Sequence, residues 1–274
     1  MDQKIALITG GTSGIGLEVV KGLIKKNYKL LVVGRNKENI DKINKEIDFN
    51  NKIIFFYCDL SETDQIKKLL IKLKDYNKID LLINNAGALF ATRENNSQGI
   101  EKTFALNHLS YFQITTGILN QLEKSNSARI INVSSNMHRI FNLDINDLEN
   151  KKYYNGWKAY SNSKFLNILF TYHLSKKLKN SVVCNCLSPG FIDSEFGNNN
   201  KSIFRIFIKI LKKLLAKTTK KGAETILHMA LSKNLSSING KFFQDCKIKE
   251  TSKKTYDADL MKKAWELSLN YINI

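Results

Sequence analysis

Six short, nearly continuous apolar runs alternate with stretches of helical periodicity along this chain, and this alternation limits the fold more than any other feature. The runs cover residues 5–9, 30–34, 53–58, 81–84, 130–134 and 182–187. Strands that are buried on both faces have this pattern, and the helices between them form the crossovers of a parallel sheet. We therefore expect an α/β fold with a doubly wound, mostly parallel sheet of the Rossmann type.

No proline-rich linker, internal repeat or low-complexity tract interrupts the alternation, so we expect one domain over residues 1–274. A chain of this length can bury a substantial core. Residues 201–221 differ, because their apolar and basic side chains separate onto two faces of a helix. Two readings of this segment follow from its pattern: packing on the core, and an interfacial helix on anionic lipid.

A glycine-rich turn follows the first apolar run and opens a helix. Its expected cofactor-binding residues are Gly10, Thr12, Ser13, Gly14, Ile15 and Gly16. Glycines let the backbone approach a pyrophosphate, and the N-terminus of a helix supplies free N–H groups and a positive dipole end. No Lys-Ser/Thr pair follows the last glycine, so this is not a Walker loop. The turn predicts a dinucleotide site, with a purely structural turn as the alternative.

The end of the second run indicates which dinucleotide is bound. An acidic side chain there would hold the ribose 2′-hydroxyl of NAD, but Gly34 stands in its place and Arg35 follows. A guanidinium can pair with the 2′-phosphate of NADP. We therefore expect a preference for NADP(H), with NAD(H) as the alternative cofactor and a surface arginine as the alternative role.

Polar and small residues close the third and fourth runs, at the sheet edge where adenine and ribose would lie. They are Asp59, Leu60, Asn85, Ala86 and Gly87. We expect them to contact the cofactor, and helix capping or turn formation is the alternative.

Tyr160 and Lys164 form the expected proton-transfer pair. A spacing of four on a helix brings both side chains to one face. A free phenol has a pKa of about 10, and a neighbouring positive charge favours the phenolate. We therefore expect the ammonium to lower the phenol pKa toward the working range of an acid–base group.

The formal net charge of +18 first suggests an acidic partner, but the lysines are scattered along the chain and accompany no nucleic-acid motif. We expect a solvated basic surface and no nucleic-acid partner. The four cysteines do not form a disulfide framework, and the four histidines lack ligand spacing, so we expect reduced thiols and no metal. No apolar run is long enough to span a bilayer and no signal peptide is evident, so we expect a cytoplasmic location, with peripheral membrane contact left open.

Several motifs in order give the chain its resemblance to the short-chain dehydrogenase/reductase family. These are residues 9–16, Asn84-Asn85-Ala86-Gly87, Tyr160-x3-Lys164 and Ser188-Pro189-Gly190. Within that family the chain most resembles the retinol dehydrogenase-like group, which includes the WW-domain-containing oxidoreductases. The supporting segments lie at residues 106–109, 132–135, 163–170, 221–225 and 240–246.

The resemblance implies a catalytic tetrad of Asn107, Ser135, Tyr160 and Lys164, with Ser134 as the fallback for the serine. It implies that Tyr160 donates a proton to the carbonyl oxygen while Ser135 hydrogen-bonds that oxygen. It also implies that Lys164 holds the nicotinamide ribose and that Asn107 anchors a relay water. The further cofactor contacts that it implies are Pro189, Gly190 and Ile192.

In this family the segment after the sixth strand covers the substrate, which makes residues 195–220 the expected lid. A lid rich in Phe, Ile and Leu suggests a lipophilic aldehyde, ketone or alcohol as the substrate. The resemblance thus implies an NADP(H)-dependent oxidoreductase, with a homodimer as one open form of assembly. Other readings stay open: a catalytically silent NADP(H)-binding scaffold, and a steroid-modifying or sugar-nucleotide-modifying enzyme of the same fold.

Overall fold

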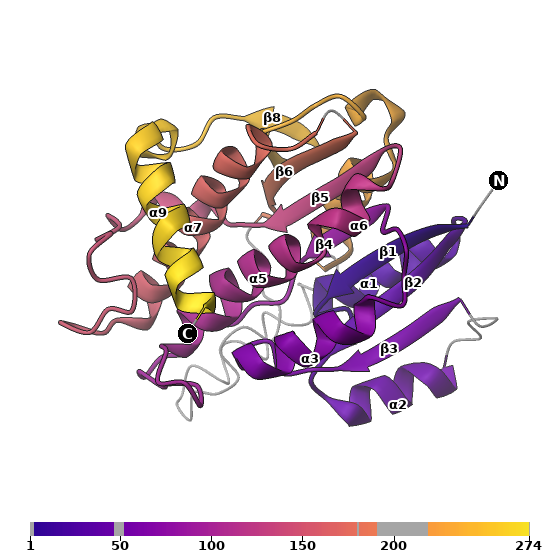
Figure 1. Cartoon of the computed structure of the whole chain (residues 1–274), viewed down its shortest axis with the longest axis horizontal. Coiled ribbons are helices and arrows are strands. Elements are labelled where there is room, and N and C mark those ends of the chain that lie inside the picture. The colour runs from indigo at the N-terminus through magenta and orange to yellow at the C-terminus, as the bar shows by residue number, and fades with distance from the viewer. Residues whose placement is uncertain (1–2, 47–51, 180, 191–218, 274) are drawn as a thin grey trace.

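The computed structural model describes residues 3–46, 52–179, 181–190 and 219–273. Eight strands in these ranges form one sheet with the order β3-β2-β1-β4-β5-β6-β7-β8 (Figure 1). The strands are β1 (Lys4–Thr9), β2 (Tyr28–Gly34), β3 (Ile53–Tyr57), β4 (Leu81–Asn84), β5 (Ala128–Val133), β6 (Val182–Ser188), β7 (Phe242–Gln244) and β8 (Lys247–Lys249). Only the β7–β8 pair is antiparallel. The predicted doubly wound, mostly parallel α/β fold is confirmed.

Helices connect the strands on both faces of the sheet. The α-helices are α1 (Gly14–Ile24), α2 (Lys37–Glu46), α3 (Thr63–Leu73), α4 (Lys102–Phe104), α5 (Ser110–Gly117), α6 (Leu119–Glu123), α7 (Gly156–Ser175) and α9 (Ala258–Ile272). Residues 219–231 are also helical. A π-helix, η1 (Ala105–Leu109), joins α4 to α5, and 3₁₀ turns lie at η2 (Asn136–Arg139), η3 (Lys233–Leu235) and η4 (Lys253–Tyr256).

Alternation along each strand divides the core into two layers. Ala6 and Ile8 of β1 pack with α1 and residues 219–231 on one face, whereas Leu7 packs with α3 and α5 on the other. Successive side chains of a strand point to opposite faces, so a strand covered on both sides must be apolar throughout. The central strands are therefore buried along most of their length, as the continuous apolar runs predicted.

Helix α7 is buried on almost all of its surface, because it lies between the sheet and α9 (Figure 1). Phe165, Leu166 and Leu169 pack in a cluster with Met261 and Ala264 of α9. An ordinary surface helix has one polar face in water. Here the polar residues of α7 are enclosed instead, and each of them must find a partner within the protein.

The carboxyl ends of β1, β4, β5 and β6 lie next to one another, because these strands are neighbours in the sheet. The chain reverses its direction of winding between β1 and β4. Ligands of doubly wound sheets bind in the crevice at such a switch point. The loops after Thr9, Asn84, Val133 and Ser188 are therefore expected to build the functional site.

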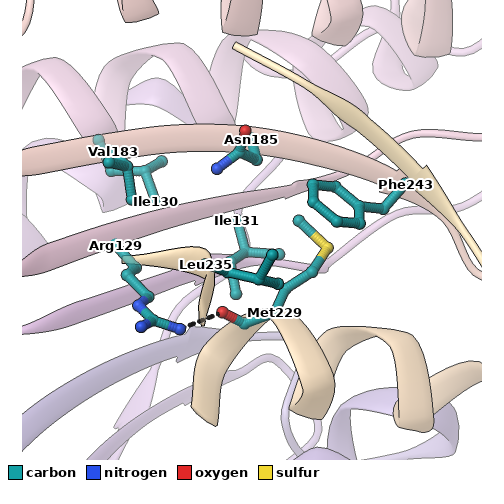
Figure 2. A pocket seen from close by; sticks show the side chains of 8 residues that line it. All are labelled: Arg129, Ile130, Ile131, Val183, Asn185, Met229, Leu235 and Phe243. Carbon is teal, nitrogen blue, oxygen red and sulfur yellow. Dashed lines mark hydrogen bonds between the residues drawn. The ribbon is translucent and has the colours of Figure 1, made fainter. Parts of the chain in front are cut away.

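A small hollow lies between the sheet and residues 219–231 (Figure 2). Arg129, near the start of β5, lines this hollow. Its guanidinium donates hydrogen bonds to the carbonyl oxygens of Met229 (2.7 Å) and Ser232 (2.8 Å). A cation at the C-terminal end of a helix satisfies carbonyls that have no helical partner. None of the predicted site residues lines this hollow, and its Arg129 guanidinium binds the end of the helix 219–231.

The final hairpin was not among the six predicted strands. Strands β7 and β8 are three residues each, too short for a periodic pattern to identify. Asp245 and Cys246 join them, and both have positive φ values, 49° and 60°. Such a tight turn requires the left-handed conformation, which costs a residue with a side chain more than it costs glycine.

Replacement of Cys246 by glycine should raise the free energy of unfolding by about 0.5–1 kcal/mol, since glycine adopts positive φ without the steric cost. Urea unfolding of the purified protein measures the change. The control Gly240→Ala should act in the opposite direction, because φ is 63° there and a Cβ atom would lie 2.6 Å from Ser175 Oγ. A less stable Cys246→Gly protein would mean that the 3.8 Å contact of the thiol with Thr225 outweighs the turn.

Candidate active site

The glycine-rich turn lies between the end of β1 and the start of α1, packed against the loop after β4. Gly10 and Gly14 have φ values of 65° and 51°. A Cβ atom on Gly10 would lie 2.9 Å from Ala86 Cα, and one on Gly16 would lie 2.0 Å from the carbonyl oxygen of Gly10. Only glycine permits both this conformation and this backbone contact.

The start of α1 fits the diphosphate of a dinucleotide. Its N-cap residue, Ser13, makes no side-chain capping bond, and the first turn contains no acidic residue. Free N–H groups and the positive end of the helix dipole attract anions. The turn that carries Thr12 and Ile15 therefore has the chemistry that the predicted cofactor requires.

The end of β2 has no room for an acidic side chain. A Cβ atom on Gly34 would lie 2.4 Å from Cγ2 of Thr12, which packs over it. Arg35 follows at the surface.

The loop after β3 lies next to the end of β2. Here the Asp59 carboxylate accepts hydrogen bonds from the backbone N–H (2.9 Å) and hydroxyl (2.7 Å) of Ser61, while Leu60 is buried. Asp59 thus shapes the turn before α3, and its predicted contact with the cofactor stays a prediction.

The loop after β4 connects the glycine-rich turn to the proton-transfer residues. The Asn85 side chain donates hydrogen bonds to the carbonyl oxygens of Thr9 (3.1 Å) and Gly10 (3.2 Å). Two residues later, a Cβ atom on Gly87 would lie 3.1 Å from Asn107 Oδ1 and 3.4 Å from Lys164 Nζ. The loop therefore runs directly past the lysine, and any side chain at position 87 would crowd it.

Asn107 is held on three sides within η1. Its amide pairs with the backbone of Ala88 in both directions, each bond being 2.9 Å long, and also donates to Ser163 Oγ (3.0 Å). Its own carbonyl oxygen accepts a hydrogen bond from Asn167 Nδ2 (2.9 Å). Single turns of π-helix are frequent at functional sites. This one fixes Asn107 between the β4 loop and α7.

The two serines after β5 have different partners. Ser134 is buried and donates to the carbonyl oxygen of Lys164 (2.7 Å). Ser135 caps η2 and its hydroxyl also hydrogen-bonds Tyr160. The structure therefore brings Ser135, rather than Ser134, to the tyrosine.

Tyr160 and Lys164 share one face of α7, as their spacing predicted. The ammonium lies 5.6 Å from the centroid of the Tyr160 ring and donates a hydrogen bond to the carbonyl oxygen of Val133 (3.0 Å). Lys164 is only 2% exposed and Tyr160 9%. The pair is thus held in a water-poor environment beside the ends of β4 and β5.

The pKa values of the pair differ from the sequence-based expectation. Burial raises the pKa of Tyr160, and the hydrogen bond with Ser135 lowers it by less. Burial lowers the pKa of Lys164 to about 7. Desolvation penalises the charged form of each group. The net shift of the Tyr160 pKa is therefore upward, opposite to the direction expected from the spacing alone.

A buried chain of hydrogen bonds links this pair to the C-terminal helix. His108 Nδ1 lies 3.0 Å from Asn167 Oδ1, and Nε2 lies 2.8 Å from Ser268 Oγ of α9. Asn167 Nδ2 contacts the carbonyl oxygens of Asn107 and Val133, so its Oδ1 faces the histidine as an acceptor. Nδ1 of His108 therefore donates to Asn167 Oδ1, while Nε2 faces Ser268 Oγ, which itself donates a hydrogen bond to the carbonyl oxygen of Ala264 (2.7 Å).

Sequence reasoning did not identify His108 and Asn167 as parts of the site. The available signal for Asn167 was the pattern of α7, whose apolar residues lie on all its faces with polar residues among them. Such a helix is expected to be enclosed, so its polar side chains need partners within the protein. Burial also lowers the pKa of His108 to about 4, which keeps the ring neutral.

The turn after β6 bears the remaining predicted contacts. Pro189 and Gly190 lie at the carboxyl edge of the sheet, and Gly190 has a φ of 89°. Ile192 lies outside the described residues. So does the predicted lid at 195–220, apart from its last two residues, which belong to the helix 219–231.

Two general features bear on ligands and location. No group of three or more His, Cys, Asp or Glu side chains within the described ranges could hold a metal ion. In the same part of the chain, no helix is both long and apolar enough to cross a bilayer.

Comparison with known proteins identifies similar chains. The family model for short chain dehydrogenases matches residues 4–203. Human polyprenol dehydrogenase is 33% identical, with 97% of this chain and 84% of that protein covered. Human retinol dehydrogenase 11 is 31% identical (99% and 86% covered), and bovine retinol dehydrogenase 12 is 32% identical (99% and 87%).

Solved structures share the fold at lower sequence identity. An uncharacterised protein from Mycobacterium paratuberculosis has a TM-score of 0.81 at 23% identity, covering 99% of this chain and 94% of that one. A tryptophan variant of actinorhodin polyketide ketoreductase, crystallised with NADPH, has a TM-score of 0.67 at 21% identity, with 88% and 95% covered.

The buried neutral histidine should make folding stability depend on pH. The pKa of His108 is about 4 when folded and about 6.5 when unfolded, so the unfolded chain binds more protons between these values. Its contribution should be fully present above pH 6.5 and lost as pH falls toward 4, by roughly 2–3 kcal/mol. Urea unfolding at a series of pH values measures this slope.

The variant His108→Gln keeps a donor and an acceptor but cannot titrate. It should therefore reduce the slope in this pH window and leave the part that His138 contributes, since burial lowers the pKa of that histidine to about 4 as well. An identical slope in the variant and the parent would assign the acid sensitivity to other groups.

Proposed function

Because the chain belongs to the short-chain dehydrogenase family and to its retinol dehydrogenase-like group, we propose that it interconverts a lipophilic aldehyde or ketone and the corresponding alcohol. We further propose NADP(H) as its hydride carrier. The observation that carries the proposal is the Ser135–Tyr160 hydrogen bond beside a buried lysine, at the strand ends where a ligand of this fold binds.

The cofactor would lie along the loops already described. Gly10, Gly14 and Gly16 give the diphosphate access to the start of α1, and the loop of Asn85 to Gly87 leads to Lys164. The nicotinamide supplies the hydride when bound. Pro189, Gly190 and Ile192 stay predicted contacts on the nicotinamide side.

The chain's own residues handle the proton. Tyr160, kept neutral by burial, donates its phenolic proton to the substrate oxygen, and the Ser135 hydroxyl hydrogen-bonds the same oxygen. Donors that are already oriented stabilise the negative charge that develops there, and exclusion of water strengthens the effect. The Lys164 ammonium then stabilises the phenolate. Asn107 fixes the backbone of Ala88 and the hydroxyl of Ser163 near the lysine. The family resemblance implies that it also anchors the relay water.

Features of the β2 end support NADP(H). A Cβ atom on Gly34 would lie 2.4 Å from Thr12 Cγ2, and glycine supplies no carboxylate at the position where NAD-binding sheets hold the ribose 2′-hydroxyl. Arg35 is exposed beside Gly34 and can form two charge-assisted bonds with a 2′-phosphate.

The relatives support a lipophilic substrate, since they are named for retinol and polyprenol. Such compounds dissolve in membranes, so we propose a cytoplasmic protein that contacts the membrane surface peripherally. An excess of basic residues favours contact with anionic lipid.

Purified protein should oxidise NADPH in the presence of aldehydes or ketones, with activity rising along a panel of increasing chain length. Tyr160→Phe should lower kcat by at least about a hundredfold because it removes the acid, while NADPH affinity stays nearly unchanged. Absorbance measures turnover and fluorescence titration measures affinity. Tyr76→Phe, on the far side of the molecule, is the control. Cofactor binding without turnover on any substrate would favour a silent scaffold instead.

Arg35→Ala should weaken NADPH binding by roughly 10- to 100-fold, because charge-assisted bonds to the 2′-phosphate are lost. Affinity for NADH, which lacks that phosphate, should not change. Lys25→Ala removes an exposed cation at the other end of α1 and controls for general charge. A surviving preference for NADPH would reject the phosphate clamp.

A further inference from the structure

The ammonium of Lys164 is buried and has no anionic partner among the described residues. Its hydrogen bond goes to the neutral carbonyl oxygen of Val133 (3.0 Å). No carboxylate in the described part of the chain forms an ion pair with it. A buried charge needs compensation or it gives up its proton.

Two aromatic rings flank this ammonium. Nζ lies 5.4 Å from the centroid of the Tyr111 ring on α5 and 5.6 Å from that of Tyr160 on α7. A cation within about 6 Å of a ring is attracted to its negative face, and the attraction is strongest where water is absent. The lysine therefore lies at cation–π distance from a ring on each of two helices.

Tyr111 takes part through its ring and not through its hydroxyl. The residue is completely buried, and the hydroxyl has no hydrogen-bond partner among the described residues. Burial raises the pKa of this phenol well above its usual value, so it supplies no negative charge. An unpaired buried hydroxyl costs stability, whereas the ring makes a favourable contact.

We propose that Tyr111 is a positioning residue of the active site, whose ring stabilises the charged form of Lys164 and so keeps it ready to support Tyr160. The catalytic part of this inference rests on the proposed function; the ring–ammonium contact does not.

Apart from the Tyr160 ring, which also flanks the ammonium, the other groups that face Lys164 supply no negative charge. Tyr160 from α7 is neutral, as is Tyr111 from α5. His108 from η1 is neutral because burial lowers its pKa to about 4. Loss of the Tyr111 ring should therefore lower the pKa of Lys164 further. In carbonyl reduction, which needs the ammonium, the alkaline limb of the pH–rate profile should then move to lower pH.

Carbon-13 NMR of the lysine side chains in the full-length protein measures this titration directly, and Lys164→Met identifies the signal. Tyr111→Leu should lower the Lys164 pKa by about one unit or more. Tyr111→Phe keeps the ring and should leave it at the value of the parent protein. Tyr172→Leu, which removes another buried tyrosine of the fold, controls for general loss of packing.

Fluorinated phenylalanines at position 111 provide a test that does not change the shape of the core, in case Tyr111→Leu fails to fold. Each added fluorine weakens the negative face of the ring, so the Lys164 pKa should fall stepwise. An unchanged titration across this series, or an equal fall in Tyr172→Leu, would overturn the proposal.

The two readouts separate this inference from the proposed function. If the protein reduces no carbonyl but the NMR titration shifts as expected, the ring contact stands and the proposed reaction fails. If reduction proceeds and the alkaline limb does not move in Tyr111→Leu, Tyr111 has no positioning role.

Discussion

Enclosure of α7 between the sheet and α9 is the constraint on which the site depends. The helix carries Tyr160, Lys164 and Asn167, all nearly inaccessible to solvent. The apolar clusters around it exclude water and fix its position. Burial therefore has two effects here: it stabilises the fold, and it makes every polar group on the helix depend on partners from the protein.

Those partners come from segments far apart in the sequence. Asn167 contacts the carbonyl oxygens of Asn107 and Val133, and through His108 it is connected to Ser268 of α9. Fully paired buried networks hold side chains in one arrangement. The C-terminal helix thus contributes to the geometry of the site although none of its residues is a predicted catalytic group.

Local pattern was sufficient to predict much of this architecture. Continuous apolar runs predicted the six long parallel strands, and the spacing of Tyr160 and Lys164 predicted their common face. The short strands β7 and β8 and the π-helix η1 lacked such a pattern, because tertiary contacts determine them. The pKa of Tyr160 was predicted in the wrong direction, since a spacing of four reveals proximity and does not reveal depth of burial.

The protonation states of Tyr160 and Lys164 bear on which direction of the proposed reaction, reduction or oxidation, the site favours. Reduction begins with a protonated tyrosine, the form that burial favours. Proton transfer still proceeds from a phenol with a raised pKa, because an alkoxide is a stronger base than a phenolate. Oxidation begins with the phenolate, the form that burial disfavours and that the Lys164 charge must stabilise. Burial of Tyr160 thus favours the protonation state that the proposed carbonyl reduction requires, and the proposed oxidation depends more strongly on the Lys164 charge.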